Sequence, residues 1–239
     1  NNHYALIFDG PAFVAWRQSY LDHEPIVRLQ EPFTFVIVAR KDNANVDKVS
    51  DLVGRSICAH ASPNLGTLLF LSKFNNPARQ PVIAEIKGWD KAYEGVTSGK
   101  CLGTILPNGS LKKFEANGTS TVKIIARFEA MPNQAFTIST RVNKAVREKI
   151  FEALTRPEPN KDLAKLLTAY GSTGFVEAHG EEYSPYYNLL KDEWQFSNAI
   201  TRIVAERSTS VPVGKVSVGA PAVAVETSYS SPGKRNERK

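Results

Sequence analysis

The sequence predicts an α/β protein made of two lobes, one of them inserted into the other. Short apolar strands alternate with amphipathic helices along most of the chain, a pattern typical of α/β folds. The block from about residue 46 to residue 127 is a strand–helix series of its own, and the segments that flank it could pair with each other across the gap. Because strand–helix–strand units join parallel strands, we expect mostly parallel sheets.

The expected strands are short apolar runs that end at Gly, Pro or polar turns. The run FTFVIVAR at 33–40 is apolar throughout, which is typical of a strand covered on both faces. In chain order the expected strands cover residues 4–8, 33–40, 56–60, 82–86, 101–107, 121–128 and 131–140.

The expected helices show apolar residues at helical spacing, and several carry end signals such as Ser50 at a start and Gly99 after an end. They cover residues 12–20, one turn near residue 50, 65–74, 89–98, 110–116, 143–154, 163–170 and a long terminal helix at 186–206.

These elements define the expected domain boundaries. We expect a first lobe at residues 1–41 and 129–207 and an inserted lobe at 42–128, with crossovers near Arg40 and Met131. Residues 208–239 are rich in Val, Pro, Ser, Gly and Ala, lack a lasting periodicity and are expected to be a flexible tail.

Composition narrows the class of protein. A chain of 239 residues with 42% hydrophobic residues can build a real core. The net charge is +6, but the last six residues, KRNERK, supply +3 of it, so we expect no nucleic-acid partner. No apolar run approaches the roughly 18 residues of a membrane span, so membrane contact is expected only through a partner or a missing N-terminal anchor. The first strand begins almost at residue 1, which suggests that the fold starts before this sequence does.

The residues that usually carry catalysis or bind metals do not form a recognisable set. Cys58 and Cys101 lie inside apolar runs, and we expect two buried free thiols rather than a disulfide or a metal pair. The four histidines lack metal-ligand spacing, so no metal site and no cofactor are expected. Cys58 and His60 lie two residues apart without a third orienting group, so no catalytic residue is expected.

The turn SPNLGT, residues 62–67, joins a strand to a helix and consists mainly of small polar residues. The first amides of a helix have no partner within it, and the helix dipole adds roughly half a positive charge there. Ser62 and Thr67 would add hydroxyl donors, and Gly66 would let a ligand approach, so the turn could bind a phosphate, phosphonate, sulfate or carboxylate. The alternative is an ordinary cap, in which Ser62 or Asn64 bonds the first turn.

Three further stretches place the turn in a wider pattern. The order of three stretches resembles the periplasmic phosphate, phosphonate and phosphite substrate-binding proteins of ABC importers. These stretches are DLVGRSICAHASPNLGTLLFLSKF, which contains the turn, GWDKAYEGVTSGKCLGTILP and YGSTGFVEAHGEEYSPY. The opening ALIFDGPAFVAW is similar to that family's Asp–Gly–Pro segment, and the similarity covers about Ala5 to Tyr187. The resemblance implies a type II periplasmic-binding fold with a ligand cleft between the lobes.

The resemblance also implies a set of ligand-binding residues at the starts of three helices. Trp89 stands where many members have a ligand-contacting His, and it could stack on a ligand or pack in the core. Cys101 stands where members that bind aminoalkyl phosphonates tend to have Asp. The expected ligand-binding residues are Asp9, Gly10, Pro11, Ser62, Asn64, Leu65, Gly66, Thr67, Trp89 and Asp90.

The function implied by this resemblance is capture of a small anionic ligand. We expect a solute-binding protein, or a sensor lobe, that works in the periplasm or another extracytoplasmic space. Its partner would be the membrane permease of an importer or a signalling protein. Two alternatives remain open: an enzyme on the same fold, such as a pyrimidine-precursor synthase, and an interaction protein that keeps the fold without a ligand.

Overall fold

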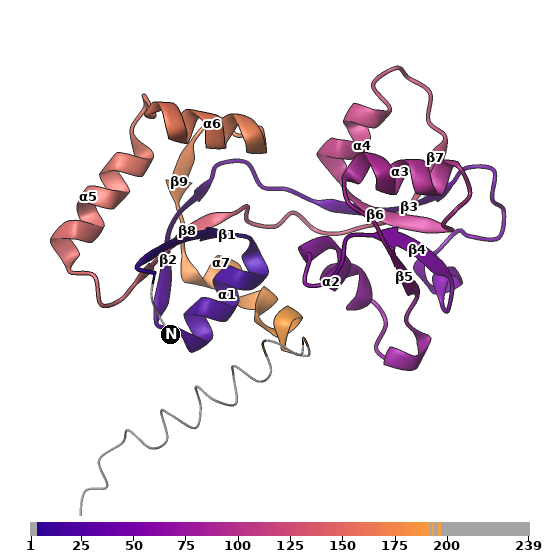
Figure 1. Ribbon diagram of the computed structural model, residues 1–239, viewed down its shortest axis with the longest axis horizontal. Coiled ribbons are helices and arrows are strands. Elements are labelled where there is room, and N and C mark those ends of the chain that lie inside the picture. Colours follow the sequence, from indigo (N-terminus) through magenta and orange to yellow (C-terminus); the bar gives the residue numbers. More distant parts are fainter. Residues whose placement is uncertain (1–3, 192, 194–195, 197–239) are drawn as a thin grey trace, which may run out of the picture.

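The computed structural model describes residues 4–191, 193 and 196, which form two lobes joined by two extended segments (Figure 1). Each lobe is built around its own sheet, one of four strands and one of five. The four-stranded lobe contains both described ends of the chain, and the five-stranded lobe is inserted between β2 and β8 of the first. We call them lobe 1 and lobe 2. The two-lobed α/β prediction is confirmed.

The sheet of lobe 1 has the strand order β1-β8-β2-β9, and every pairing in it is antiparallel. The expectation of mostly parallel sheets is therefore wrong for this lobe, because its strands come from both sides of the insertion and pair across the gap. Its strands are β1 (Leu6–Asp9), β2 (His23–Leu29), β8 (Ala135–Ser139) and β9 (Phe175–Glu177).

Helices cover both faces of this sheet (Figure 1). On one face Val14 and Ala15 pack with Tyr183, and on the other Leu154 and Leu167 pack against the strands. The first group is α1 (Pro11–Tyr20), α7 (Gly180–Tyr183) and the 3-10 helix η3 (Ser184–Leu190); the second is α5 (Lys144–Thr155) and α6 (Lys161–Tyr170). The expected terminal helix at 186–206 is replaced as far as Leu190 by η3, and its remainder lies mostly outside the described residues.

The sheet of lobe 2 has the order β5-β4-β6-β3-β7 and is mixed. Strands β5, β4 and β6 are parallel, as expected, whereas β3 is antiparallel to both β6 and β7. Its strands are β3 (Phe35–Arg40), β4 (Ser56–Ala59), β5 (Val82–Glu85), β6 (Gly103–Pro107) and β7 (Val122–Arg127).

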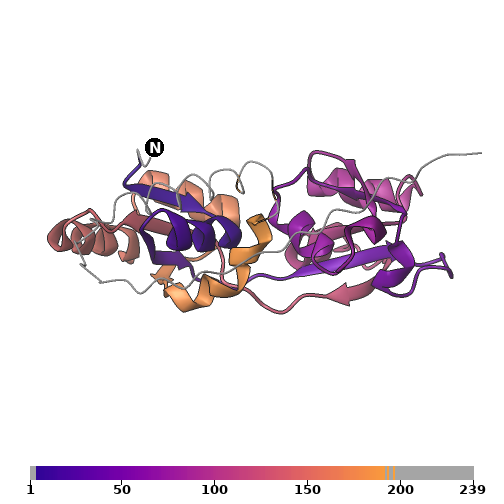
Figure 2. The ribbon, with the colours of Figure 1, turned by 90° about the horizontal axis from the view of Figure 1, so that it is seen from below.

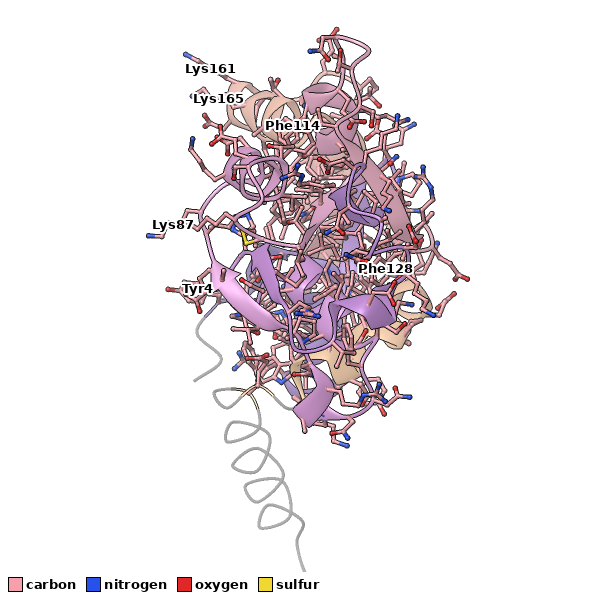
Figure 3. The ribbon with its side chains drawn as sticks, turned by 90° about the vertical axis from the view of Figure 1, so that its right-hand side faces the viewer. Tyr4, Lys87, Phe114, Phe128, Lys161 and Lys165 are labelled. Carbon is pink, nitrogen blue, oxygen red and sulfur yellow. A yellow bond between two sulfur atoms is a disulfide. The ribbon has the colours of Figure 1, made fainter. Side chains whose placement is uncertain are left out.

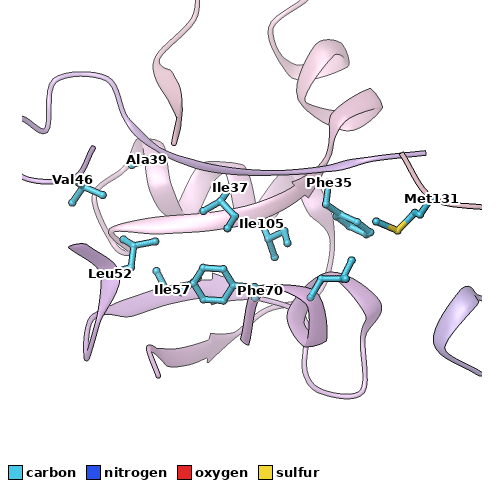
Figure 4. Close-up of a cluster of buried hydrophobic side chains, with 11 residues drawn as sticks. Phe35, Ile37, Ala39, Val46, Leu52, Ile57, Phe70, Ile105 and Met131 are labelled. Carbon is cyan, nitrogen blue, oxygen red and sulfur yellow. The ribbon is translucent and has the colours of Figure 1, made fainter. Parts of the chain in front are cut away.

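Two apolar layers bury this sheet. Ile37, Ile57 and Ile105 pack against Phe70 of α2 on one face (Figure 4), and the other face packs against α3 and α4. This double burial explains why β3 is apolar from Phe35 to Ala39. The helices are η1 (Val49–Leu52), α2 (Leu65–Leu71), η2 (Pro77–Arg79), α3 (Trp89–Thr97) and α4 (Asn108–Phe114).

β3 belongs to the sheet of lobe 2, which moves the expected boundary between lobe 1 and lobe 2. Because β3 pairs with β6 and β7, the chain enters lobe 2 before residue 35, and the expected crossover near Arg40 is wrong. The two crossovers run side by side between the lobes, where Phe33 and Met131 exchange backbone hydrogen bonds of 3.1 and 2.9 Å. The proposed tail at 208–239 lies outside the described residues.

The two cysteines form a disulfide, so the expectation of free thiols is wrong. The bond is drawn in yellow in Figure 3. Cys58 on β4 and Cys101 just before β6 have Cα atoms 5.6 Å apart, and both side chains are buried. Parallel pairing of β4 with β6 brings them together although 43 positions separate them, a contact that apolar patterning does not reveal. Within the described part of the chain, no helix has the length and apolar character needed to cross a bilayer.

Candidate ligand-binding site

The edge of lobe 2 that faces lobe 1 is where β4, β5 and β6 end. These strands are parallel, so their carboxyl ends share one edge, and Phe35 at the start of β3 pairs with Pro107 at the same edge. The crossovers leave from this edge as well, so it points toward lobe 1 (Figure 1). In open α/β sheets, ligands bind outside the carboxyl ends of the strands. The residues that follow these strands are thus the candidates on this lobe.

The facing edge of lobe 1 carries the first expected group. Asp9 ends β1 and pairs in register with Ala135, where the return crossover enters β8. Gly10 then caps α1 with Pro11 as its first residue, and a Cβ placed on Gly10 would meet no atom within 4 Å. Asp9 is already ion-paired to Arg17, in the last turn of α1. Gly10 therefore leaves open space at the helix start, whereas the carboxylate of Asp9 is committed within the protein.

The turn at residues 62–67 satisfies much of its own hydrogen bonding. The side-chain oxygen of Asn64 accepts from the backbone amides of Gly66 at 2.9 Å and Thr67 at 3.4 Å. The Thr67 hydroxyl donates to the His60 carbonyl at 2.7 Å and is almost completely buried. Asn64 is thus the helix cap that the sequence left as an alternative, and the Thr67 hydroxyl is engaged internally.

The remaining members of the turn also face protein. A Cβ on Gly66 would lie 3.0 Å from the Phe35 ring, so the missing side chain makes room for that ring. Leu65 packs into the apolar cluster that joins α2 to α1. The Ser62 hydroxyl donates to the carboxylate of Glu193, near the described end of the chain. The turn lies at the facing edge as expected, but the Ser62 and Thr67 hydroxyls and the backbone amides of Gly66 and Thr67 already have partners within the protein.

Trp89 opens α3 at the same edge and is half-buried. Its ring centroid lies 4.2 Å from that of His60 and 6.0 Å from that of Phe35, in edge-to-face arrangements. One side of Trp89 packs on the core, as one of the two alternatives expected, and the residue keeps solvent contact; its stacking on a ligand stays a prediction. Asp90 is exposed, and its carboxylate lies over Gly88, where a Cβ would come within 2.4 Å of it.

His60 is the polar residue that links these parts. It follows β4 directly, and its Nε2 atom is buried without a hydrogen-bond partner among the described residues. Burial lowers the pKa of its imidazole, so the ring is neutral at pH 7 and offers one donor and one acceptor. Trp89 holds the ring from the side.

A pocket of about 450 Å³ lies at this edge between the loops that follow β4 and β5. His60 and Asn64 line one side, and Glu85 and Lys87 line the other. An ammonium, an imidazole and an amide can together bind an oxyanion, while a carboxylate in the same pocket disfavours a second negative charge. The structure thus brings Asn64 and His60 into one pocket, with Trp89 against His60; Asp9 and Asp90 are placed elsewhere.

Several residues at this site are not predicted from the sequence, among them His60, Glu85, Lys87 and Glu193. Sequence reasoning considers His60 only for metal binding and catalysis, although its place directly after a buried strand is a usable signal. Lys87 precedes the Gly–Trp helix start and carried no distinctive spacing, and Glu193 reaches the turn only through tertiary structure. Cys58, two residues before His60, is disulfide-bonded and carries no free thiol.

Comparisons with known proteins agree on the family and the fold. The sequence model described as ABC transporter, phosphonate, periplasmic substrate-binding protein matches residues 1–183. No curated protein matches the chain significantly.

Solved structures share the fold at low identity. XAC2383 of Xanthomonas citri bound to ATP superposes with a TM-score of 0.62 at 12% identity, over 84% of this chain and 79% of that one. A binding protein component of an ABC phosphonate transporter from Pseudomonas aeruginosa gives 0.55 at 10% identity over 86% and 78%. PhnD1 of Prochlorococcus marinus in complex with methylphosphonate gives 0.54 at 15% identity over 78% and 77%.

Proposed function

Because the chain belongs to the phosphonate family of periplasmic substrate-binding proteins of ABC transporters, we propose that it captures a small oxyanion in the cleft between its lobes. A phosphonate, phosphite or phosphate is the candidate ligand, in keeping with the methylphosphonate bound by PhnD1 of Prochlorococcus marinus. The protein binds and releases this ligand without changing it, and its partner is the permease of an importer.

The observation that carries this proposal is the pocket at the carboxyl ends of β4 and β5. It gathers the Lys87 ammonium, the neutral His60 imidazole and the Asn64 amide at the edge that faces lobe 1. These groups complement a small anion with donors of three kinds. Glu85 on the same pocket favours a singly charged anion, or a ligand that also carries a cation, over a fully charged dianion.

Two further features support an extracytoplasmic transport role. The Cys58–Cys101 disulfide is of a kind that persists in oxidising compartments such as the periplasm. The open helix start at Gly10 leaves room on the opposite lobe for part of a ligand.

Native mass spectrometry of the purified full-length protein tests the proposal. We expect an adduct with the mass of a small oxyanion, or one that forms when methylphosphonate is added. The adduct should weaken in the His60→Ala variant, which removes the imidazole from the pocket. An exposed-site control, Glu158→Ala, should leave it unchanged. No adduct with methylphosphonate, phosphite or phosphate at millimolar concentration would contradict the proposal.

A further inference from the structure

The 3-10 helix η3, which follows α7, lies between the two lobes (Figure 2). It belongs to lobe 1 by sequence, since it follows β9 and α7 directly. Tyr186 of η3 nevertheless packs against two separate cores, the lobe 1 cluster around Val14 and the lobe 2 cluster around Ile37. One short segment therefore touches the apolar interior of both lobes.

An apolar junction continues along this segment. Leu190 at the end of η3 packs with Trp16 of α1 and Leu68 of α2, so side chains from both lobes meet in one cluster. Leu190 is 0% exposed and Leu68 is 5% exposed. Burial this complete stabilises the present placement of the lobes, because separating them would return these side chains to water.

A polar contact completes the junction. The Glu193 carboxylate accepts a hydrogen bond from the Ser62 hydroxyl, in the turn that begins α2. A carboxylate is itself an oxyanion, so this side chain takes from Ser62 the bond that an external anion would take. The apolar cluster holds Glu193 close to the turn and makes its local concentration high.

We propose that η3 and Glu193 together form an interlobe strap that holds α2 against lobe 1, and that the Glu193 carboxylate is an internal competitor for the Ser62 hydroxyl. This inference rests on the proposed function in one respect, the competition with an external anion. An anion in the proposed pocket, which Ala61 and Asn64 line on either side of Ser62, displaces the carboxylate from the Ser62 hydroxyl and releases the polar part of the strap. The strap thereby couples occupancy of the site to the contact between the lobes.

The test compares Glu193→Gln with Glu181→Gln, which removes the same charge from an exposed position on α7. Hydrogen–deuterium exchange reports on residues 62–71 without any ligand, and calorimetry with inorganic phosphate and methylphosphonate reports on binding. For Glu193→Gln we expect faster exchange in residues 62–71 and an anion affinity about three- to tenfold higher, as the loss of one competing charged acceptor implies. Glu181→Gln should change neither.

The other possible results of these two experiments each decide a different part of the proposal. Unchanged exchange in Glu193→Gln overturns the strap contact. Faster exchange with unchanged affinity overturns the competition. Faster exchange in a protein that binds neither anion supports the strap and contradicts the proposed function instead. Leu68→Ala provides a second variant, since it thins the apolar junction and should accelerate exchange in residues 184–190 if the strap depends on it.

Discussion

The imidazole of His60 is the titrating group of the proposed site. Burial lowers its pKa below the ordinary value of about 6.5, so the folded protein binds a proton there less readily than the unfolded chain does. Below pH 6.5 the unfolded state gains protons that the folded state does not, and the free energy of unfolding falls as the pH falls.

A first prediction follows for the thermal stability of a His60→Gln variant. The wild-type melting temperature should fall between pH 7.5 and pH 5.5, and the variant should show a shallower fall, because its side chain does not titrate. Differential scanning calorimetry at four pH values measures the two slopes. Equal slopes would contradict the role assigned to burial of His60.

Gly95 and Gly109, two helix glycines of lobe 2, provide a matched pair of substitutions that tests the packing around individual residues. A Cβ at Gly95 in α3 would lie 2.5 Å from Cys58 Sγ, whereas a Cβ at Gly109 in α4 would meet nothing within 4 Å. Gly95→Ala should lower the free energy of unfolding by about 1–3 kcal/mol through overpacking against the disulfide. Gly109→Ala should be neutral or raise it by about 0.5–1 kcal/mol. Urea titration measures both, and an equal effect at the two positions would refute the packing argument.

The individual residues of the turn at 62–67 show why its contacts could not be predicted from the sequence. The residue types predicted a helix start that could bind an anion, and they also allowed Asn64 as its cap. The structure assigns the cap to Asn64, turns the Thr67 hydroxyl inward and places Gly66 against Phe35. Composition cannot separate these outcomes, because they depend on which side chains the core brings near. Substitutions of Gly66 or Thr67 would therefore disturb folding before they report on binding.

At the scale of elements, the disulfide joins β4 to the loop that precedes β6. A cross-link across 43 positions reduces the entropy of the unfolded chain, and its loss typically costs about 2–4 kcal/mol. The double variant Cys58→Ala, Cys101→Ala should lose that amount in urea unfolding. A reducing agent should destabilise the wild type and leave the double variant unaffected. Equal stability of the two proteins without reductant would contradict a stabilising bridge.

A carboxylate fixes the first crossover to lobe 1. Glu31 accepts hydrogen bonds from the Ser172 hydroxyl and from the amide and hydroxyl of Thr173, at 3.0 and 2.6 Å for the last two. Burial raises its pKa, but these hydrogen bonds outweigh that effect and lower the pKa to about 2. Asn133 of the return crossover donates to the Glu31 carbonyl at 2.9 Å, so the two crossovers are tied at the same level.

The corresponding prediction concerns acid stability. Glu31 stabilises the fold fully above its ordinary pKa of about 4.5, and this contribution is lost as the pH falls toward 2. The Glu31→Gln variant should have a lower melting temperature than the wild type at pH 7. Between pH 5 and pH 2.5 its melting temperature should fall less than that of the wild type. Glu158→Gln, at an exposed position, is the control and should follow the wild type. A variant whose loss over that range equals that of the wild type would show that Glu31 contributes nothing.

Elements with strong apolar periodicity were predicted within a few residues of their bounds, among them α1, α3 and β3. The missed strands are β2 and β9. β2 reads HEPIVRL, with a proline and charges among its residues; the structure identifies it as a strand by its pairing with β8 and β9 and by the alternating burial of His23, Pro25, Val27 and Leu29. β9 has three residues, too few for a pattern. The direction in which the strands of lobe 1 pair could not be predicted either, because β2 pairs with β8 and β9, which lie more than a hundred residues away in the sequence.

At the scale of the whole molecule, the two-lobed arrangement could be predicted because the order of motifs carries it, and the family match and the fold comparisons confirm it. The position of the first crossover could not be predicted from the sequence, since an apolar strand such as β3 fits either sheet equally well. The packing of η3 against both lobes could not be predicted either, because it depends on the placement of one lobe against the other.

The measurement that tests the central claim most directly is isothermal titration calorimetry of the full-length protein with methylphosphonate, with sulfate and a small carboxylate for comparison. The account predicts a single site on the wild type and at least a tenfold weaker site in Lys87→Ala, which removes the ammonium from the pocket; Lys165→Ala, an exposed lysine on α6, should bind like the wild type. Absence of heat from all three anions, or equal affinity in Lys87→Ala and the wild type, would contradict the claim that this pocket captures a small oxyanion.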